Sequence, residues 1–287
     1  MGAIALGLGW GFEHFASQMG PWRQLTRSLA GAALRQLVEV GPIEEGTKLG
    51  GVLLASWVLG YWKQHSSQPS TLLLCTGAIA LGFTAEENWI YLFNNSASIF
   101  DRTIGTPTHA WFAAPWGYAL GIAAMRGDGR SPPLPILWFV TKAWLNAVGC
   151  HALVNIFSIA WGYPSPLNWL SYGLFPFLLW LLWRMDGLIR RSQGQSPLAL
   201  ISGPTPIHRY WQQGLAIFAL VLGGNAILGL FLLVRNLNAI NLSQVLVQPD
   251  PAFLRLLAIH LTLNFIPGLL AWGIYRHLRN TSDRRYY

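Results

Sequence analysis

The chain has 287 residues, of which 53% are hydrophobic and only 10% are charged, and its mean hydropathy is +0.37. Water-soluble domains carry about 25% charged residues, so this composition excludes a soluble globular fold. It also excludes disorder, because so apolar a chain has ample surface to bury. We therefore expect a single all-α membrane domain over residues 1–287, built as a polytopic transmembrane helix bundle. The net charge of +8 is scattered between apolar runs, which favours a lipid bilayer and no nucleic acid as the partner.

Eight apolar segments are long enough to cross a bilayer, for which a helix needs roughly 20 mostly apolar residues. In chain order these predicted spans are 25–42, 43–62, 71–93, 107–125, 134–161, 167–183, 212–234 and 252–275. The dipeptide Gly41-Pro42 divides the first two, since a proline typically ends a helix. The longest polar connection, 184–211, contains Gly, Ser and Pro and is predicted to be a linker.

Basic residues predict the orientation of these spans. They are concentrated in every second connection, whereas the alternate connections contain only Arg102 and Arg235. The basic connections are 13–24, 63–70, 126–133, 184–211 and 276–287. Because cytoplasmic loops carry an excess of Lys and Arg, we expect a cytoplasmic C-terminus and an integral protein of the plasma (inner) membrane.

Several ionisable residues lie inside the predicted spans, where each costs at least a few kcal/mol unless it has a partner or a function. Arg35 and Glu39 are four residues apart on one helix face, so we expect them to neutralise each other. Glu44 and Lys48 have the same spacing and can form a second pair, with Glu45 as an additional acid. Alternatively, one of these glutamates is a general base that takes a proton from water.

Two histidines occupy comparable positions further along the chain. His109 opens the span 107–125, and His151 lies late in 134–161, where Asn155 shares its helix face. A lone histidine inside a bundle can be a hydrogen-bonded packing residue or a ligand, because neutral imidazole both donates and accepts.

A second acidic pair, Glu86 and Glu87, lies in the span 71–93. Adjacent residues point about 100° apart on a helix, so only one of the two can face a given site. His260 falls near the middle of the last span and is predicted to be structural.

The predicted directions of the spans bring Glu44, Glu87, His109 and His151 to one level, near the non-cytoplasmic face. Two histidines and two or more glutamates can hold a divalent metal such as zinc, which acidifies a bound water. They can also activate water without a metal. With or without a metal, an activated water would carry out a hydrolysis. A proton-coupled membrane transporter uses the same residue types, and an inactive scaffold or immunity-type protein keeps such a fold without activity.

Four motifs follow one another on successive predicted helices. They are Glu44-Glu45-Gly46-Thr47-Lys48, Gly82-Phe83-Thr84-Ala85-Glu86-Glu87-Asn88, His109-Ala110 with Gly117-Tyr118 and Gly121, and Cys150-His151 with Asn155. This ordered series resembles the PrsW family of intramembrane proteases, which is related to the CAAX-protease and bacteriocin-processing (CPBP/ABI) superfamily. The resemblance covers about residues 41–157, within a catalytic core of about 25–161.

The resemblance implies an intramembrane endopeptidase that hydrolyses membrane-embedded or membrane-tethered proteins, such as an anti-sigma-factor-like regulator. It implies Glu44 as the general base, supported by Glu45 and Lys48. It also implies that Asn155 steadies the oxyanion. The implied metal ligands or water holders, with zinc as a possible metal, are Glu87, His109 and His151. We expect these three side chains to form one cluster that Glu86 does not join.

Overall fold

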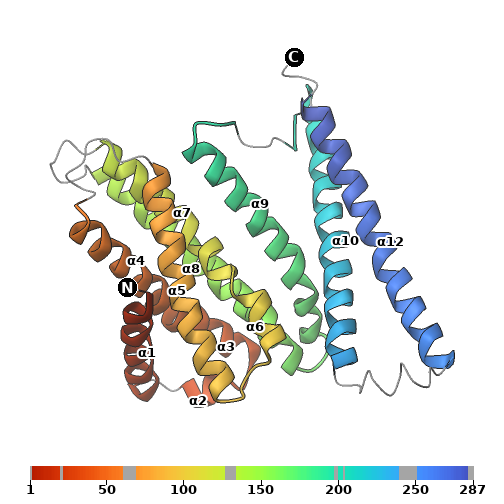
Figure 1. Ribbon diagram of the computed structural model, residues 1–287, viewed down its shortest axis with the longest axis horizontal. Coiled ribbons are helices and arrows are strands. Elements are labelled where there is room, and N and C mark those ends of the chain that lie inside the picture. Colours follow the sequence, from red (N-terminus) through yellow and green to blue (C-terminus); the bar gives the residue numbers. More distant parts are fainter. Residues whose placement is uncertain are drawn as a thin grey trace. The chain divides into compact units, whose positions relative to one another are not determined.

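Figure 1 shows the computed structural model, which describes residues 2–19, 22–60, 69–126, 134–196, 200–202, 204–238 and 251–283. Every regular element among these residues is a helix, so the predicted all-α class is confirmed. The α-helices are α1 (Gly2–Met19), α2 (Trp22–Leu25), α3 (Leu29–Arg35), α4 (Gly41–Val58), α5 (Pro69–Phe93), α6 (Ile99–Gly105), α7 (Thr108–Arg126), α8 (Leu134–Ile159), α9 (Leu174–Ser192), α10 (Pro206–Asn238) and α12 (Pro251–Asp283).

Four of the described helices are both long enough and apolar enough to cross a membrane. They cover Pro69–Phe93, Pro135–Gly162, Pro206–Leu237 and Pro251–Ser282. The protein is therefore a membrane helix bundle, as its composition predicts.

The chain divides into two compact units. The first comprises residues 1–168 and 181–197, and the second comprises 169–180 and 198–287. All of the predicted site residues belong to the first unit.

The predicted break at Gly41-Pro42 is wrong. Helix α3, a π-helical turn (Gln36–Val40) and α4 follow one another without interruption, and Gly41 itself has helical angles of φ −58° and ψ −50°. An α-helical proline clashes with the carbonyl four residues before it, whereas a π turn is wider and pairs residues five apart. Here the Gly41 N–H donates to the Gln36 carbonyl. The wider turn thus lets the helix pass Pro42.

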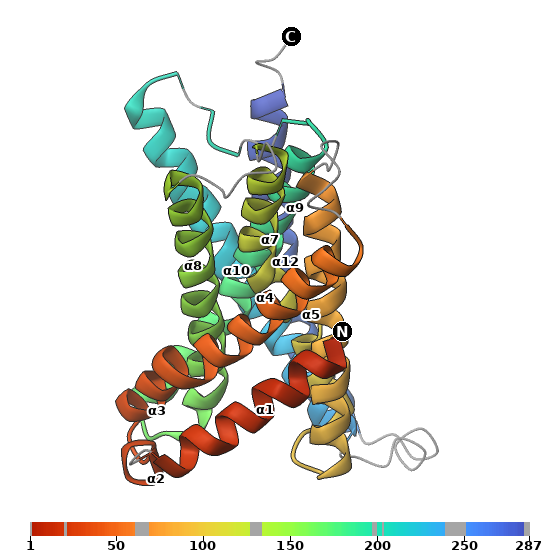
Figure 2. The same ribbon diagram turned by 90° about the vertical axis from the view of Figure 1, so that its left-hand side faces the viewer.

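Residues 29–58 consequently form one helix about 45 Å long at 1.5 Å per residue. Glu44 lies near its middle, and not at the outer end of a span as predicted. A helix longer than the hydrocarbon core, which is about 30 Å thick, must tilt to span it. Figure 2 shows α1 and α4 running obliquely to α5, α7 and α8. One continuous helix over 29–58 therefore replaces the two spans predicted at 25–42 and 43–62.

Helices α5 and α7 approach closely along a face of α7 that carries two glycines. A Cβ on Gly117 would lie 2.5 Å from Thr76 Oγ1, and a Cβ on Gly121 would lie 2.6 Å from Pro69 Cα. Small residues allow helix backbones to come this near in a membrane. Because the two helices run antiparallel, this contact brings the start of α7, with His109, beside the end of α5, with Glu87.

Helix α9 extends further than predicted, so the connection to α10 is shorter than the predicted linker 184–211. An Asp186–Arg190 ion pair of 2.8 Å supports the last turns of α9, and Gly194, at φ +71°, follows its end. Helix α10 begins at Pro206, also earlier than predicted.

In the second unit α10 packs against α12, and Gly229 leaves space for the Asn264 side chain. His260 lies 2.9 Å from the Leu256 carbonyl of its own helix through Nδ1. The structural role of His260 stays a prediction.

Gly41 should tolerate no side chain. A Cβ at this position would lie 2.8 Å from the Gln36 carbonyl oxygen and 3.2 Å from Val148 Cγ1 of α8. We expect Gly41→Ala to destabilise the fold by about 1–3 kcal/mol, since both contacts must open. Thermal unfolding of the detergent-solubilised protein measures the change. Gly50→Ala is the matched control, because a Cβ on Gly50 of the same helix meets nothing within 4 Å. Equal melting temperatures for the two variants would contradict the prediction.

Candidate functional site

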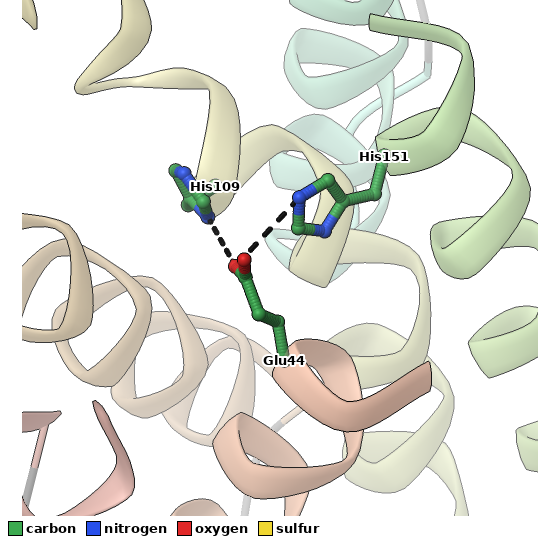
Figure 3. Close-up of side chains that lie close together, drawn as sticks. All are labelled: Glu44, His109 and His151. Carbon is green, nitrogen blue, oxygen red and sulfur yellow. Dashed lines mark ion pairs between the residues drawn. The ribbon is translucent and has the colours of Figure 1, made fainter. Parts of the chain in front are cut away.

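Three buried side chains from three helices converge in the first unit. Glu44 of α4 lies with its Oε2 3.7 Å from His109 Nδ1 of α7 and 3.6 Å from His151 Nε2 of α8. Figure 3 shows the Glu44 carboxylate pointing between the two imidazole rings. One ligand atom from each residue lies within 4.8 Å of the others. Residues that are 65 and 107 positions from Glu44 in the sequence thus share one small volume.

Each imidazole has a second carboxylate on its other nitrogen. His151 Nδ1 lies 3.2 Å from Glu45 Oε1, and His109 Nε2 lies 3.2 Å from Glu87 Oε2. In metal sites, the histidine ligand almost always donates its free N–H to a carboxylate, carbonyl or water, which holds the ring orientation. Glu45 and Glu87 are placed to do this for the two rings.

Lys48 joins the same cluster from the next turn of α4. Its Nζ lies 2.8 Å from Glu45 Oε1, 3.4 Å from Glu44 Oε2 and 2.8 Å from His109 Nδ1. The side chain is fully buried, and its Nζ lies 4.4 Å from the centre of the Phe83 ring. A buried ammonium needs such partners, because removing one of them would leave an uncompensated charge.

Aromatic rings pack around the two imidazoles. The Phe112 ring stacks on His151 at a centroid distance of 4.9 Å and an interplanar angle of 17°. Phe83 lies 5.9 Å from His109, and the two imidazoles are 5.2 Å apart, nearly perpendicular at 82°. Both phenylalanines are buried. These rings restrict the rotamers of the histidines and exclude lipid and water from their sides.

Trp116 is a site residue that the sequence reasoning missed. It is fully buried, and its Nε1–H donates to Glu45 Oε2 over 3.1 Å, so both oxygens of Glu45 have partners. His109, Phe112 and Trp116 follow one another at intervals of three and four residues, which puts them on one face of α7. That spacing is visible in the sequence and could have identified Trp116.

Most of the predicted site residues form one continuous cluster in the structure: Glu44, Glu45, Lys48, Glu87, His109 and His151. Glu44, His109 and His151 form the group that we call the three-donor group, and Glu44 is its acidic member. Glu87 contacts His109 on the nitrogen that faces away from Glu44. The chemical roles assigned to these residues stay predictions.

Other predicted residues lie outside this cluster. Asn155 donates through Nδ2 to Gln36 Oε1 of the π turn over 2.8 Å. Glu86 is exposed. The predicted Arg35–Glu39 pair is confirmed, with a separation of 3.3 Å.

The donor set fits a divalent cation. Two imidazole nitrogens and one carboxylate oxygen are ordinary zinc ligands, and tetrahedral ligands at about 2.1 Å from a zinc ion lie roughly 3.4 Å apart. The distances of 3.6 and 3.7 Å are close to this spacing. Lys48 contacts two of the proposed ligand atoms, since its Nζ lies 2.8 Å from His109 Nδ1 and 3.4 Å from Glu44 Oε2. A metal bound here would take the place of the ammonium at these atoms.

In the comparison with known proteins, a family model described as PrsW family intramembrane metalloprotease matches residues 1–182. The chain belongs to this family. The match contains every residue of the site and is longer than the predicted resemblance of 41–157, while α10 and α12 lie outside it. No curated protein and no solved structure matches the chain. The wider relation to the CPBP superfamily stays a prediction.

As a PrsW family member, the chain is an integral membrane protein and, at the level of the family, an intramembrane protease. The family description also names a metalloprotease, in agreement with the buried group of Glu44, His109 and His151.

Trp116→Phe should destabilise the protein because it leaves Glu45 Oε2 without the indole donor in a buried place. An unsatisfied buried acceptor costs about 1–3 kcal/mol, so the thermal unfolding temperature in detergent should fall. Trp57→Phe on α4 is the control, since the Trp57 side chain is 74% exposed. If the Trp116 variant melted no lower than the Trp57 variant, the indole–Glu45 bond would contribute nothing to stability.

Proposed function

We propose that this protein is an endopeptidase that hydrolyses a peptide bond of a membrane-embedded or membrane-tethered protein at a zinc centre held by Glu44, His109 and His151. The observation that supports the proposal most directly is the geometry of these three buried donors, whose ligand atoms lie within 4.8 Å of one another. The carboxylates on the far nitrogens of the two histidines give further support. The identity of the substrate, including an anti-sigma-factor-like regulator, stays a prediction.

Zinc is favoured over magnesium or calcium because two of the three donors are imidazole nitrogens, whereas those harder ions prefer oxygen. A bound zinc ion would polarise the scissile carbonyl and lower the pKa of a water molecule.

The side chains of the protein supply the remaining functions. Glu44 is the carboxylate that faces the shared space, so it can hold the metal through Oε2 and accept the proton of the attacking water. Glu45 and Glu87 accept the N–H groups of His151 and His109 and keep the opposite nitrogens directed toward Glu44. Lys48 holds Glu44 and Glu45 in place by ion pairs.

Asn155 remains a proposed oxyanion donor. Its Nδ2 group donates to Gln36 Oε1 in the structure, so this role requires that the hydrogen bond be exchanged for one to the substrate. The exchange would couple substrate binding to the π turn that precedes Glu44.

Glu44→Gln should abolish both zinc binding and peptide-bond cleavage at the proposed centre. The amide keeps the shape of the side chain but loses its charge and basicity, so we expect loss of bound zinc and a fall in cleavage of about two orders of magnitude or more. Zinc content is measured on the purified protein. Cleavage is measured in native cells as new N-termini of membrane proteins that appear with the wild-type chain and are missing with the variant.

Glu86→Gln is the matched control for this experiment, because Glu86 is exposed and neighbours Glu87 on α5. It should keep both the zinc and the cleavage products. If the Glu44→Gln protein kept its zinc but lost cleavage, Glu44 would act as a base and not as a metal ligand. Cleavage retained by the Glu44 variant would refute the proposed mechanism.

The proposed centre opens toward the non-cytoplasmic side. His109 is the second residue of α7 and Glu87 lies within two turns of the end of α5, so both are near the connection that contains α6. The predicted charge pattern puts this connection outside and the C-terminus in the cytoplasm of a plasma (inner) membrane protein. Bonds cut should then lie near the outer end of the substrate's membrane segment.

Ser96→Cys and Asp128→Cys test this orientation in a Cys75→Ala, Cys150→Ala background. A membrane-impermeant thiol reagent added to intact cells should label position 96, which is exposed in the α5–α6 connection, and not position 128. Permeabilised cells, in which both positions should react, are the control. The inverse pattern would move the opening of the centre to the cytoplasmic side.

A further inference from the structure

Arg102 links the short helix α6 to the edge of the candidate centre. Its Nη2 lies 2.6 Å from Glu87 Oε2, and its Nε donates to Asn88 Oδ1 over 2.5 Å. The guanidinium also lies over the Tyr91 ring, with its Cζ 4.5 Å from the ring centre. From the sequence, Arg102 was only a basic residue in a connection. In the structure it holds two successive side chains of α5.

The Glu87 oxygen that binds Arg102 is the one that meets His109. Glu87 Oε2 lies 3.2 Å from His109 Nε2, and the opposite nitrogen, Nδ1, lies 2.8 Å from Lys48 Nζ and 3.7 Å from Glu44 Oε2. A continuous path of ionic contacts therefore runs from α6 to the three-donor group. Arg102 does not itself belong to that group.

We propose that Arg102 is a positioning residue, which acts through Glu87 to hold the His109 ring with Nδ1 directed toward the metal position. This inference rests on the proposed function for the metal, but the ring orientation is a property of the metal-free chain as well. The contacts of the guanidinium with both Glu87 and Asn88 fix the Glu87 carboxylate more firmly than a single ammonium contact could. Without it, the Glu87 carboxylate loses its ion pair with the guanidinium and can turn away from His109.

The α6 segment has other contacts that keep it in place. Ser98 caps its start, accepting from the Asp101 N–H over 3.1 Å, and Thr106 receives a hydrogen bond from Asn88 Nδ2 over 2.9 Å. These contacts allow the positioning role of Arg102 to be separated from the folding of α6. Ser98→Ala removes the cap, at a cost of about 1 kcal/mol, and leaves the path through Arg102 intact.

The test measures the ring orientation of His109 directly. Full-length protein with ¹⁵N-labelled histidine is prepared metal-free, and the His109 ring signals are assigned by their absence in His109→Gln. We expect Arg102→Gln to shift the His109 ring ¹⁵N signals and to leave those of His151 unchanged. Ser98→Ala should shift neither. In a Glu87→Gln background, Arg102→Gln should cause no further shift, because the path is already interrupted.

A second measurement uses Zn²⁺ affinity, determined by competition with a chelator. Removing an outer partner of a metal-binding histidine typically weakens metal binding 10- to 100-fold. Because Arg102 acts on His109 through Glu87, we expect the Kd for Zn²⁺ to rise by about 10-fold, the lower end of this range, in Arg102→Gln. It should stay within about twofold of wild type in Ser98→Ala.

Unchanged His109 signals in Arg102→Gln would overturn the positioning role, and so would equal shifts in Ser98→Ala. A wild-type chain that binds no Zn²⁺ would refute the metal in the proposed function, while the metal-free spectra would still decide the role of Arg102.

Discussion

The burial of ionised side chains inside a membrane bundle is the constraint on which the rest of the first unit depends. Glu45 and Lys48 are fully buried, 2.8 Å apart, and Glu44 is buried beside them. An unpaired charge at this depth would cost at least a few kcal/mol, and helices α6, α7 and α8 supply compensating groups. Helix α7 contributes an imidazole and the Trp116 indole, α8 contributes the second imidazole, and the Arg102 guanidinium neutralises Glu87 at the edge.

The backbone makes this convergence possible through local departures from regular packing. The π turn before α4 lets one helix continue past Pro42, and Gly41 leaves room for Val148 of α8 to approach. His151 follows Val148 by about one turn, so this contact brings the imidazole over Glu44 and Glu45. On the other side, Gly117 and Gly121 draw α7 against α5. The centre is thus assembled by close helix contacts, which membrane helices achieve with small residues.

The family match and the chemistry coincide in the first part of the chain. Residues 1–182 match the PrsW family, and the six side chains of the cluster all lie there. Helices α10 and α12 form a second compact unit with the segment 169–180, outside most of that match. Both helices are long enough and apolar enough to span a bilayer. The catalytic hypothesis therefore requires the first unit only.

The sequence by itself determined the membrane class, the helical content and the candidate site residues, because hydropathy is a local property and an ionisable residue in an apolar segment can be identified from the sequence alone. It also predicted the Arg35–Glu39 pair, which depends only on helical spacing. Only the tertiary structure decided that Glu44, and not Glu87, completes the three-donor group, and that Asn155 meets Gln36. It also showed that Trp116 and Arg102 contact Glu45 and Glu87, which lie more than a dozen residues away from them in the sequence. These outcomes depend on which helix faces meet and on the angle at which they cross, and both are set by packing between distant segments, which no local pattern contains.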